Sequence, residues 1–331
     1  WAQSNRVYLD KSNEKLTKGS RDYTDALIEN TLTYDGTIGK HHVNVVVGQT
    51  YEEEYTDLLT GWAVNFPEPY FLQLQNGAST YSSSYEYKHA IASYIGRINY
   101  NYDEKYLLSA VVRRDGSSRL SKNIRWGTFP SVSVGWRVDK EKFFPFTPDV
   151  MNMFKIRGSY GVLGNENIGE YMFQTTMNRN NMTYSFGNTP VTGSAISTFT
   201  DNNLAWEKKK TTNVGIDVAM FRNRLEFTFE WYKNVSEDLL YAVPVPAQAG
   251  VSNTEVTMNA ASMENSGFEF SATYRNNDHD FKYQIGANLS TLNNKVTSLG
   301  FGTESYIRGA YKTEVGQEIG KFYGWVYEGI A

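Results

Sequence analysis

Apolar and polar residues alternate one by one through much of this chain. Between positions 224 and 231 the odd positions are aliphatic or aromatic, and the even positions are charged or carry a hydroxyl group. A period of two places alternate side chains on opposite faces of a strand, so each such segment has one apolar and one polar face. The same alternation runs through 94–102, 106–113, 131–138, 154–162, 268–274 and 281–290.

The alternating segments are long for strands of a water-soluble sheet. We predict roughly ten strands of about 9–14 residues each, a length that suits strands crossing a membrane at a tilt. Further strands are expected near 22–34, 41–51 and 206–220, and the start of another at 322–330. No stretch approaches the ~18 consecutive apolar residues that a membrane helix needs, so any membrane crossing is expected to use strands.

The predicted connections alternate between short and long. Short links are expected at 35–40, 103–105, 221–223 and 276–280, with a somewhat longer one at 139–152. Between them lie a medium link at 114–125 and long links at 52–88, 165–205, 235–264 and 293–321. Up-and-down barrels of bacterial outer membranes sort their connections in this way, with short periplasmic turns and long outer loops.

Composition supports the same architecture. Aromatic residues make up 15% of the chain, and 24 of them are tyrosines, a residue that suits an apolar surface with a wet edge. Aromatic side chains gather beside the short links, where the inner girdle of a membrane barrel would lie. The chain has no cysteine, and its net charge of -4 without a basic stripe argues against a nucleic-acid partner.

Soluble sandwiches, propellers and lipocalin-like barrels also show alternation, and there the apolar face points into a shared core. Here the apolar face is rich in aromatic residues at its margins, and the opposite face carries Arg, Lys, Glu and Asn. We therefore favour an all-β, antiparallel, up-and-down transmembrane barrel with its apolar face toward lipid.

Several motifs follow one another in an order that resembles the barrel of SusC/RagA-type TonB-dependent transporters. The most specific stretch combines YLLSAVVRRDGSSRL at 106–120 with RWGTFPSVSVGWRV at 125–138. It is followed by FKIRGSYGVLGNENIGEY at 154–171, MENSGFEFSATYRN at 263–276 and VGQEIGKFYGWVYEGI at 315–330. The resemblance covers most of residues 90–330 and is weaker before them.

The resemblance implies a role and partners. Members of this family have plugged barrels of the 22-stranded class, take energy from the TonB complex, and import nutrients with a SusD-like surface lipoprotein. Residues 1–331 are expected to form about half of such a barrel, without a plug domain or a TonB box. The implied location is the outer membrane, crossed many times, and the implied cargo is an oligosaccharide or oligopeptide. No cofactor and no metal are expected.

Two groups of residues are candidates for contact with cargo or partner. Arg113 and Arg114 would form a charged patch or, as we favour, anchor an outer loop by ion pairs. Aromatic side chains in the expected outer loops would stack on sugar rings or anchor a lid protein, or would instead pack into a rigid rim. These aromatic candidates are Trp62, Phe66, Tyr70, Phe71, Tyr81, Tyr85, Tyr171 and Phe173.

No enzyme motif stands out, because neither a G-x-S-x-G elbow nor an H-E-x-x-H pair occurs. The carboxylates Glu226 and Glu230 share one polar face, where lumen-lining groups are more often held by Arg or Lys than used in catalysis. We therefore expect no enzymatic activity. An outer-membrane barrel enzyme and a soluble carbohydrate-binding β protein stay open as alternatives.

Overall fold

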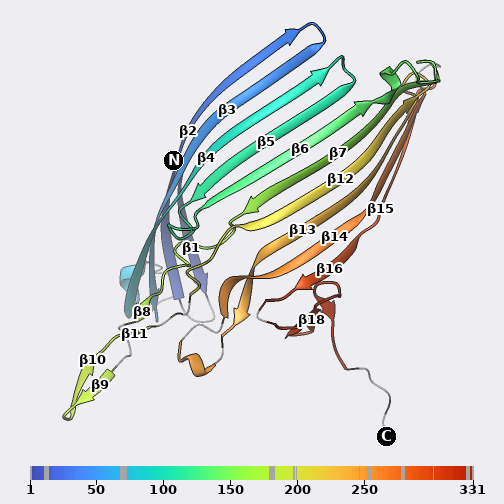
Figure 1. Ribbon diagram of the computed structural model, residues 1–331. Coiled ribbons are helices and arrows are strands. Elements are labelled where there is room, and N and C mark those ends of the chain that lie inside the picture. The colour runs from blue at the N-terminus through green and yellow to red at the C-terminus, as the bar shows by residue number, and fades with distance from the viewer. Residues whose placement is uncertain are drawn as a thin grey trace.

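The structure is a computed structural model in which one curved antiparallel sheet dominates (Figure 1). It describes residues 2–10, 15–67, 73–178, 183–196, 198, 200–245, 247–251, 255–276, 280–300, 302–325 and 329. Within these ranges the main sheet has 12 strands in the order β1-β2-β3-β4-β5-β6-β7-β12-β13-β14-β15, and β16 also pairs with β14. Nearly every neighbour in the sheet is also the next long strand in sequence, which is the up-and-down topology predicted from the alternation.

The strands of the main sheet have the following bounds. They are β1 (Ala2–Asp10), β2 (Lys15–Ile38), β3 (His41–Val64), β4 (Ser79–Tyr102), β5 (Tyr106–Ser117), β6 (Trp126–Arg137), β7 (Met151–Asn165), β12 (Glu207–Met220), β13 (Leu225–Pro244), β14 (Glu255–Asn276), β15 (Tyr283–Ser290) and β16 (Asn293–Ser298).

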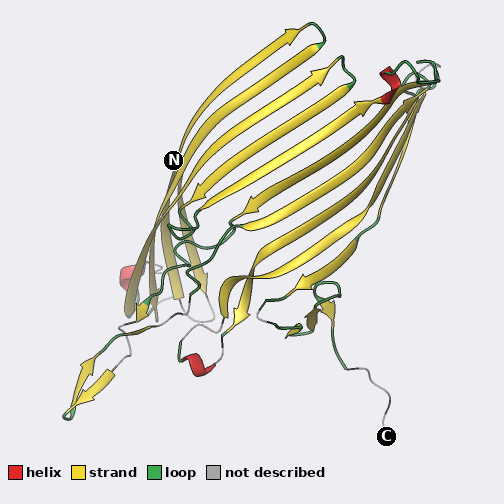
Figure 2. Cartoon of the chain, viewed as in Figure 1, coloured by secondary structure: helices red, strands yellow, loops and turns green. Residues whose placement is uncertain are grey.

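Short elements fill the connections (Figure 2). They are β8 (Met177–Asn178), β9 (Thr183–Phe186), β10 (Thr189–Thr192), β11 (Ala195–Ile196), β17 (Ser305–Arg308), β18 (Tyr311–Glu314), β19 (Lys321–Phe322) and the 3-10 turns η1 (Leu74–Asn76), η2 (Val138–Lys140) and η3 (Ala247–Ala249). Across the described ranges no helix is long and apolar enough to span a membrane.

The connections are sorted by end, as expected for a membrane barrel. β2, β4, β6, β12 and β14 all end at the upper edge of the sheet in Figure 1, and β3, β5, β7 and β13 end toward its lower edge. The Gly39–Lys40 turn joins β2 to β3 with two residues, and Gly39 has a φ of 59° that glycine adopts without steric cost. We refer to the upper edge as the periplasmic end and the lower edge as the outer end.

The two faces of the sheet differ as the alternation predicts. Cross-strand registry aligns Val45, Ile98, Ala110 and Val132 on one face. On this face Val134 is 55% exposed and Ile285 is 64% exposed, so they do not converge on a dry centre. Large exposed apolar side chains in a single-layer sheet need an apolar solvent, and lipid supplies it. We call this the lipid-facing side.

The structure corrects the predicted loop at 52–88. β3 continues to Val64 and β4 begins at Ser79, so most of the predicted loop is a paired hairpin. A strand of 24 residues is far longer than the ~10 residues that cross a membrane, so the hairpin extends beyond it. Outside the membrane both faces meet water, so the apolar alternation fades while the backbone ladder continues. The Glu52–Glu54 run is therefore compatible with a strand.

Other predicted boundaries were also wrong. The predicted loop 235–264 is largely the continuation of β13 and β14, and the predicted loop 293–321 contains β16 to β18. The strand expected at 322–330 is limited to Lys321–Phe322 in the described part, and Tyr323–Trp325 are irregular. β1 was not predicted. These strands are short or lie outside the membrane, where an apolar face is not required.

Candidate functional site

A band of small polar side chains crosses the face opposite the lipid-facing side. Registry aligns Asp35, Asn44, Asn99, Ser109, Ser133, Ser159 and Asn213 on seven successive strands of the sheet. The Asn44 amide donates to Asp35 Oδ2 at 2.9 Å, and Ser109 Oγ donates to Asn99 Oδ1 at 2.7 Å. The outer loop after β7 folds over this same face, where its Glu166 contacts His89 of β4. It is therefore the inner, lumenal face of the wall.

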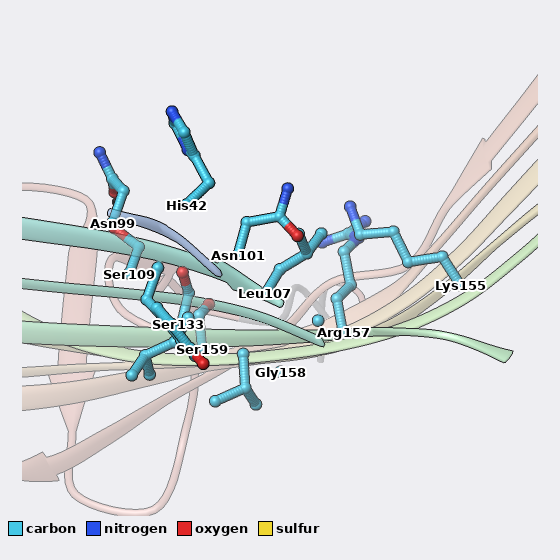
Figure 3. Close-up of a pocket in the computed structure, with 14 residues that line it drawn as sticks. His42, Asn99, Asn101, Leu107, Ser109, Ser133, Lys155, Arg157, Gly158 and Ser159 are labelled. Atoms are coloured by element: carbon cyan, nitrogen blue, oxygen red, sulfur yellow. Dashed lines mark hydrogen bonds between the residues drawn. The ribbon is translucent and has the colours of Figure 1, made fainter. Parts of the chain in front are cut away.

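The band borders a shallow cavity of about 350 Å³ on the lumenal face, shown in Figure 3. Its lining combines hydroxyl and amide groups with the cations Lys155 and Arg157. These groups donate and accept hydrogen bonds, and Leu107, Leu108 and Val134 add apolar surface beside them. Such a wall suits contact with water, with a polar cargo or with another polar protein segment.

An ion-pair network lies beside the cavity. Arg157 Nε lies 3.2 Å from Asp217 Oδ2, and Arg157 Nη2 lies 2.5 Å from Glu230 Oε2. Lys155 Nζ adds a contact of 3.6 Å to Asp217. A Cβ atom at Gly215 would lie 2.9 Å from the Arg157 guanidinium carbon, so the absence of a side chain there lets Arg157 reach both acids. Glu230, one of the two carboxylates considered for acid/base chemistry, is therefore held by Arg157.

A second, more buried cluster lies at the outer end. His89 on β4 is 6% exposed, and its Nε2 lies 3.4 Å from Glu166 Oε1 in the loop after β7. Glu170 of the same loop receives Arg119 Nε at 2.6 Å and lies 4.0 Å from His89 Nδ1. The Ser118 hydroxyl accepts the Ala90 N–H at 2.9 Å. These contacts fasten the loop after β7 to the β4 and β5 strands.

An apolar cluster continues this attachment. β6 and β7 pair only between Ser131–Gly161 and Arg137–Lys155, although both strands extend further outward. Beyond that point lies a cluster of buried side chains from five chain positions: Leu120, Phe129, Ile168, Leu204 and Trp206. The Trp206 indole N–H donates to the Arg125 carbonyl at 2.9 Å. The cluster covers a part of the wall where the backbone ladder between β6 and β7 has ended.

Of the four described aromatic candidates in 52–88, three lie on the extended β3–β4 hairpin. Trp62 and Tyr81 are cross-strand neighbours with ring centroids 5.5 Å apart, and Lys15 Nζ lies 5.5 Å from the Trp62 ring. By strand alternation Tyr85 shares their lumenal face, and it is 63% exposed. Phe66 is half-buried just past the end of β3. Tyr70 and Phe71 lie outside the described residues.

The remaining candidates separate into different environments. Tyr171 lies in the loop after β7 and its Oη donates to the Lys88 carbonyl at 3.5 Å, while Phe173 is half-buried. Arg113 donates from Nε to Asp115 at 2.7 Å on the lumenal face. Arg114 points to the opposite side, where its guanidinium lies 5.4 Å from the Trp126 ring. The two arginines therefore lie on different faces and do not form the single charged patch that was the less favoured alternative.

The periplasmic end is held by turn residues. Asp139 in η2 accepts two hydrogen bonds from Arg137, at 2.8 and 2.7 Å, and one from the Phe154 N–H at 2.9 Å. Burial raises the pKa of the Asp139 carboxyl, but these donors outweigh it and hold its pKa below the usual range. Hydrogen bonds from Tyr106 and Trp136 likewise lower the pKa of Glu141.

Sequence reasoning did not find the Arg157 network or the His89 cluster. The partners of Arg157 lie 60 and 73 positions away, so only strand registry brings them together. Glu166 and Glu170 come from a loop that has no periodic pattern to place it. Among the described residues no group of three or more His, Asp or Glu side chains is arranged to hold a metal ion.

Comparison with known proteins agrees with this geometry. The family model described as TonB dependent receptor-like, beta-barrel matches residues 1–321. TonB-dependent receptor P3 of Formosa agariphila is 35% identical over 323 residues, which are 94% of this chain and 32% of that protein. TonB-dependent receptor SusC of Bacteroides thetaiotaomicron is 31% identical, over 88% of this chain and 28% of that protein.

Solved structures give the same result. The RagAB peptide importer in its closed-closed state superposes with a TM-score of 0.82 at 26% identity, over 93% of this chain and 34% of that chain. The ferric citrate transporter FecA, at 11% identity and a TM-score of 0.52, shares the fold. The chain spans about a third of the length of the relatives it matches. It belongs to the TonB-dependent receptor β-barrel family and is of the SusC/RagA type.

Proposed function

We propose that this chain forms part of the wall of an outer-membrane transporter that imports an oligopeptide or an oligosaccharide. The observation that carries the proposal is the division of the sheet into an apolar lipid-facing side and a polar lumenal side crossed by the Asp35–Asn213 band. A wall of this kind separates lipid from a hydrated passage. Family membership supports energy supply by the TonB complex through parts of the receptor beyond this segment.

Cargo capture is assigned to the outer end of the lumenal face. The half-buried Trp62 and the exposed Tyr81 present stacked rings there, and Tyr85 adds a further exposed ring. Stacked aromatic rings bind sugar faces and apolar peptide side chains, because both offer flat or apolar surface. A SusD-like lipoprotein is the proposed partner at this end. The RagAB structures are described as those of a peptide importer, which favours a peptide cargo by analogy.

We further propose that the chain has no catalytic role. The lumenal acids Asp217, Glu230 and Glu226 are each paired with a cation, the last with Arg275 at 3.0 Å. Acids held in this way stabilise the wall and are poor general bases, because proton uptake would break an ion pair. A barrel enzyme would instead need a free nucleophile and base close together.

Uptake by cells that carry the full-length receptor tests the proposal. Labelled oligopeptides and labelled oligosaccharides are supplied separately, with and without an energised inner membrane. We expect energy-dependent uptake of one class, and a reduction of about tenfold for Trp62→Ala combined with Tyr81→Ala, because two stacking contacts are lost. Tyr55→Ala on the opposite face of β3 is the matched control and should import normally. Uptake of neither class, or unchanged uptake in the double variant, would contradict the proposal.

A further inference from the structure

The lipid-facing side of β6 carries a tryptophan at each end. Trp126 is 41% exposed and Trp136 is 36% exposed, and ten positions separate them on one strand. At about 3.3 Å per residue and a tilt of about 40°, ten residues span ~25 Å along the membrane normal, which matches the apolar band of an outer-membrane barrel. The two tryptophans therefore mark the two membrane interfaces.

At the inner interface, the charged side chains find their partners within the chain itself. The Trp136 indole N–H and the Tyr106 hydroxyl both donate to Glu141 Oε1, at 3.2 and 2.5 Å. Lys105 Nζ lies 3.5 Å from the other oxygen of the same carboxylate. The cation at this level therefore has a protein counter-ion.

The outer interface is built differently. Arg114 Cζ lies 5.4 Å from the centroid of the Trp126 ring, and the Tyr94 ring stacks on Trp126 at 6.1 Å. The indole lies directly over Gly116, where a Cβ atom would come within 2.8 Å of three ring atoms. Gly116 is buried on an otherwise exposed face because Trp126 covers it. The glycine thus lets the indole lie flat beside Arg114.

Arg114 differs from two other cations on this side of the wall. Lys88 pairs with Glu53 at 2.7 Å, and Lys233 pairs with Glu264 at 2.8 Å. In the described part of the chain no carboxylate lies within ion-pair distance of Arg114. An aromatic ring contacts one side of a guanidinium and leaves its N–H groups available for an anion.

We propose that Arg114, Trp126 and Tyr94 form a binding site for the phosphate group of an outer-leaflet glycolipid. The guanidinium would hold the phosphate through paired, charge-assisted hydrogen bonds. Trp126 and Tyr94 would contact the boundary between head group and acyl chains, where such rings are favoured. The acyl chains would lie along the exposed side chains below them, Ile98, Val112 and Val132. The site would fix the height of the wall in the membrane.

Native mass spectrometry of the detergent-purified, full-length receptor tests this site. The probes are bisphosphorylated lipid A and the same lipid with both phosphates removed. We expect the wild-type receptor to retain the phosphorylated form about tenfold better, the effect of one charge-assisted contact. Arg114→Gln should abolish the preference, and Arg114→Lys should keep part of it. Gly116→Ala, which displaces the indole, should weaken retention of both lipids.

Arg113→Gln is the matched control, because Arg113 neighbours Arg114 but pairs with Asp115 on the lumenal face. It should bind both lipids as the wild type does. Heat-dependent mobility in gels confirms that each variant is folded. Equal retention of the two lipids by the wild type, or an unchanged preference in Arg114→Gln, would overturn the proposal. Association of receptor copies through this face without lipid would overturn it as well.

Discussion

His89 and Glu166 form a buried contact between a strand of the wall and an outer loop, with 3.4 Å between Nε2 and Oε1. Their side chains are 8% and 10% exposed. The loop that carries Glu166 also holds Ile168, which packs into the apolar cluster around Phe129. Polar and apolar contacts thus fasten the same loop, and each can be removed separately.

Glu170→Ala removes the carboxylate that receives Arg119 Nε at 2.6 Å. Breaking a buried pair costs about 3–5 kcal/mol, and since Arg119 is 25% exposed we expect the effect near ~2–3 kcal/mol. The loop after β7 should then exchange its amide hydrogens much faster, as measured by hydrogen–deuterium exchange. Glu53→Ala, which removes an exposed pair with Lys88, should leave that loop unchanged. Unaltered exchange in Glu170→Ala would show that the apolar cluster alone holds the loop.

Phe129→Ala tests the apolar half of this attachment. Phe129 is 6% exposed and meets Trp206 edge-on with centroids 5.3 Å apart. Truncation of a buried phenylalanine costs about 3–5 kcal/mol, because contacts are lost and a cavity remains. A lower unfolding temperature is expected in thermal melts followed by circular dichroism. Phe186→Ala, at a position that is 76% exposed, should melt as the wild type does. Equal melting of the two variants would contradict the packing described for Phe129.

The strands that cross the membrane could be predicted because lipid imposes a rule on every second residue. Between Val132 and Trp136 each lipid-facing position must be apolar, so the alternation is visible in the sequence. Beyond the membrane neither face of the sheet contacts lipid, so the sequence of β3 from Glu52 to Val64 lacks the apolar alternation that would predict a strand. There the hydrogen bonds to β2 and β4 maintain the strand, and this pairing cannot be predicted from the residues of β3 alone.

Contacts between distant segments were also beyond prediction. Arg113 and Arg114 are adjacent in sequence and were considered together, either as one charged patch or, as favoured, as anchors of an outer loop, but successive residues of a strand point to opposite faces. The alternation did imply that the two would separate, and it should have taken precedence over their shared charge. By contrast, nothing local to His89 or Glu166 indicates that they meet.

Arg157→Ala tests the lumenal ion-pair network. It leaves Asp217 and Glu230 without their shared cation, and both side chains are only 18% exposed. We expect a loss of about 1–3 kcal/mol, since Glu230 then lacks its cation and Asp217 keeps only the 3.6 Å contact to Lys155. Lys210→Ala, which removes a pair that is over a third exposed on both sides, should cost below ~1 kcal/mol. Thermal melts of both variants give the comparison, and equal losses would contradict the network.

Asp139→Asn tests the turn after β6. The native pKa of Asp139 is lowered, so its carboxylate adds stability above its unfolded pKa of about 3.9, and this contribution is lost as the pH falls through the lower native pKa. At pH 7 the variant should therefore melt below the wild type, and the difference should shrink at pH ~3 and below. Asp149→Asn, at a site over 70% exposed, is the control and should show little difference at either pH. A difference that grows on acidification would contradict the assignment.

The direction in which each face points is tested most directly at two adjacent residues of β6. The described chain has no cysteine, so single cysteines can be placed at Ser133 and Val134 in a cysteine-free full-length receptor. With the receptor in lipid vesicles, a membrane-impermeant maleimide should label Ser133→Cys from the lumen and should not label Val134→Cys, whereas a lipid-soluble maleimide should label Val134→Cys. Labelling of Val134→Cys by the impermeant reagent, with Ser133→Cys protected, would contradict the lipid-facing assignment.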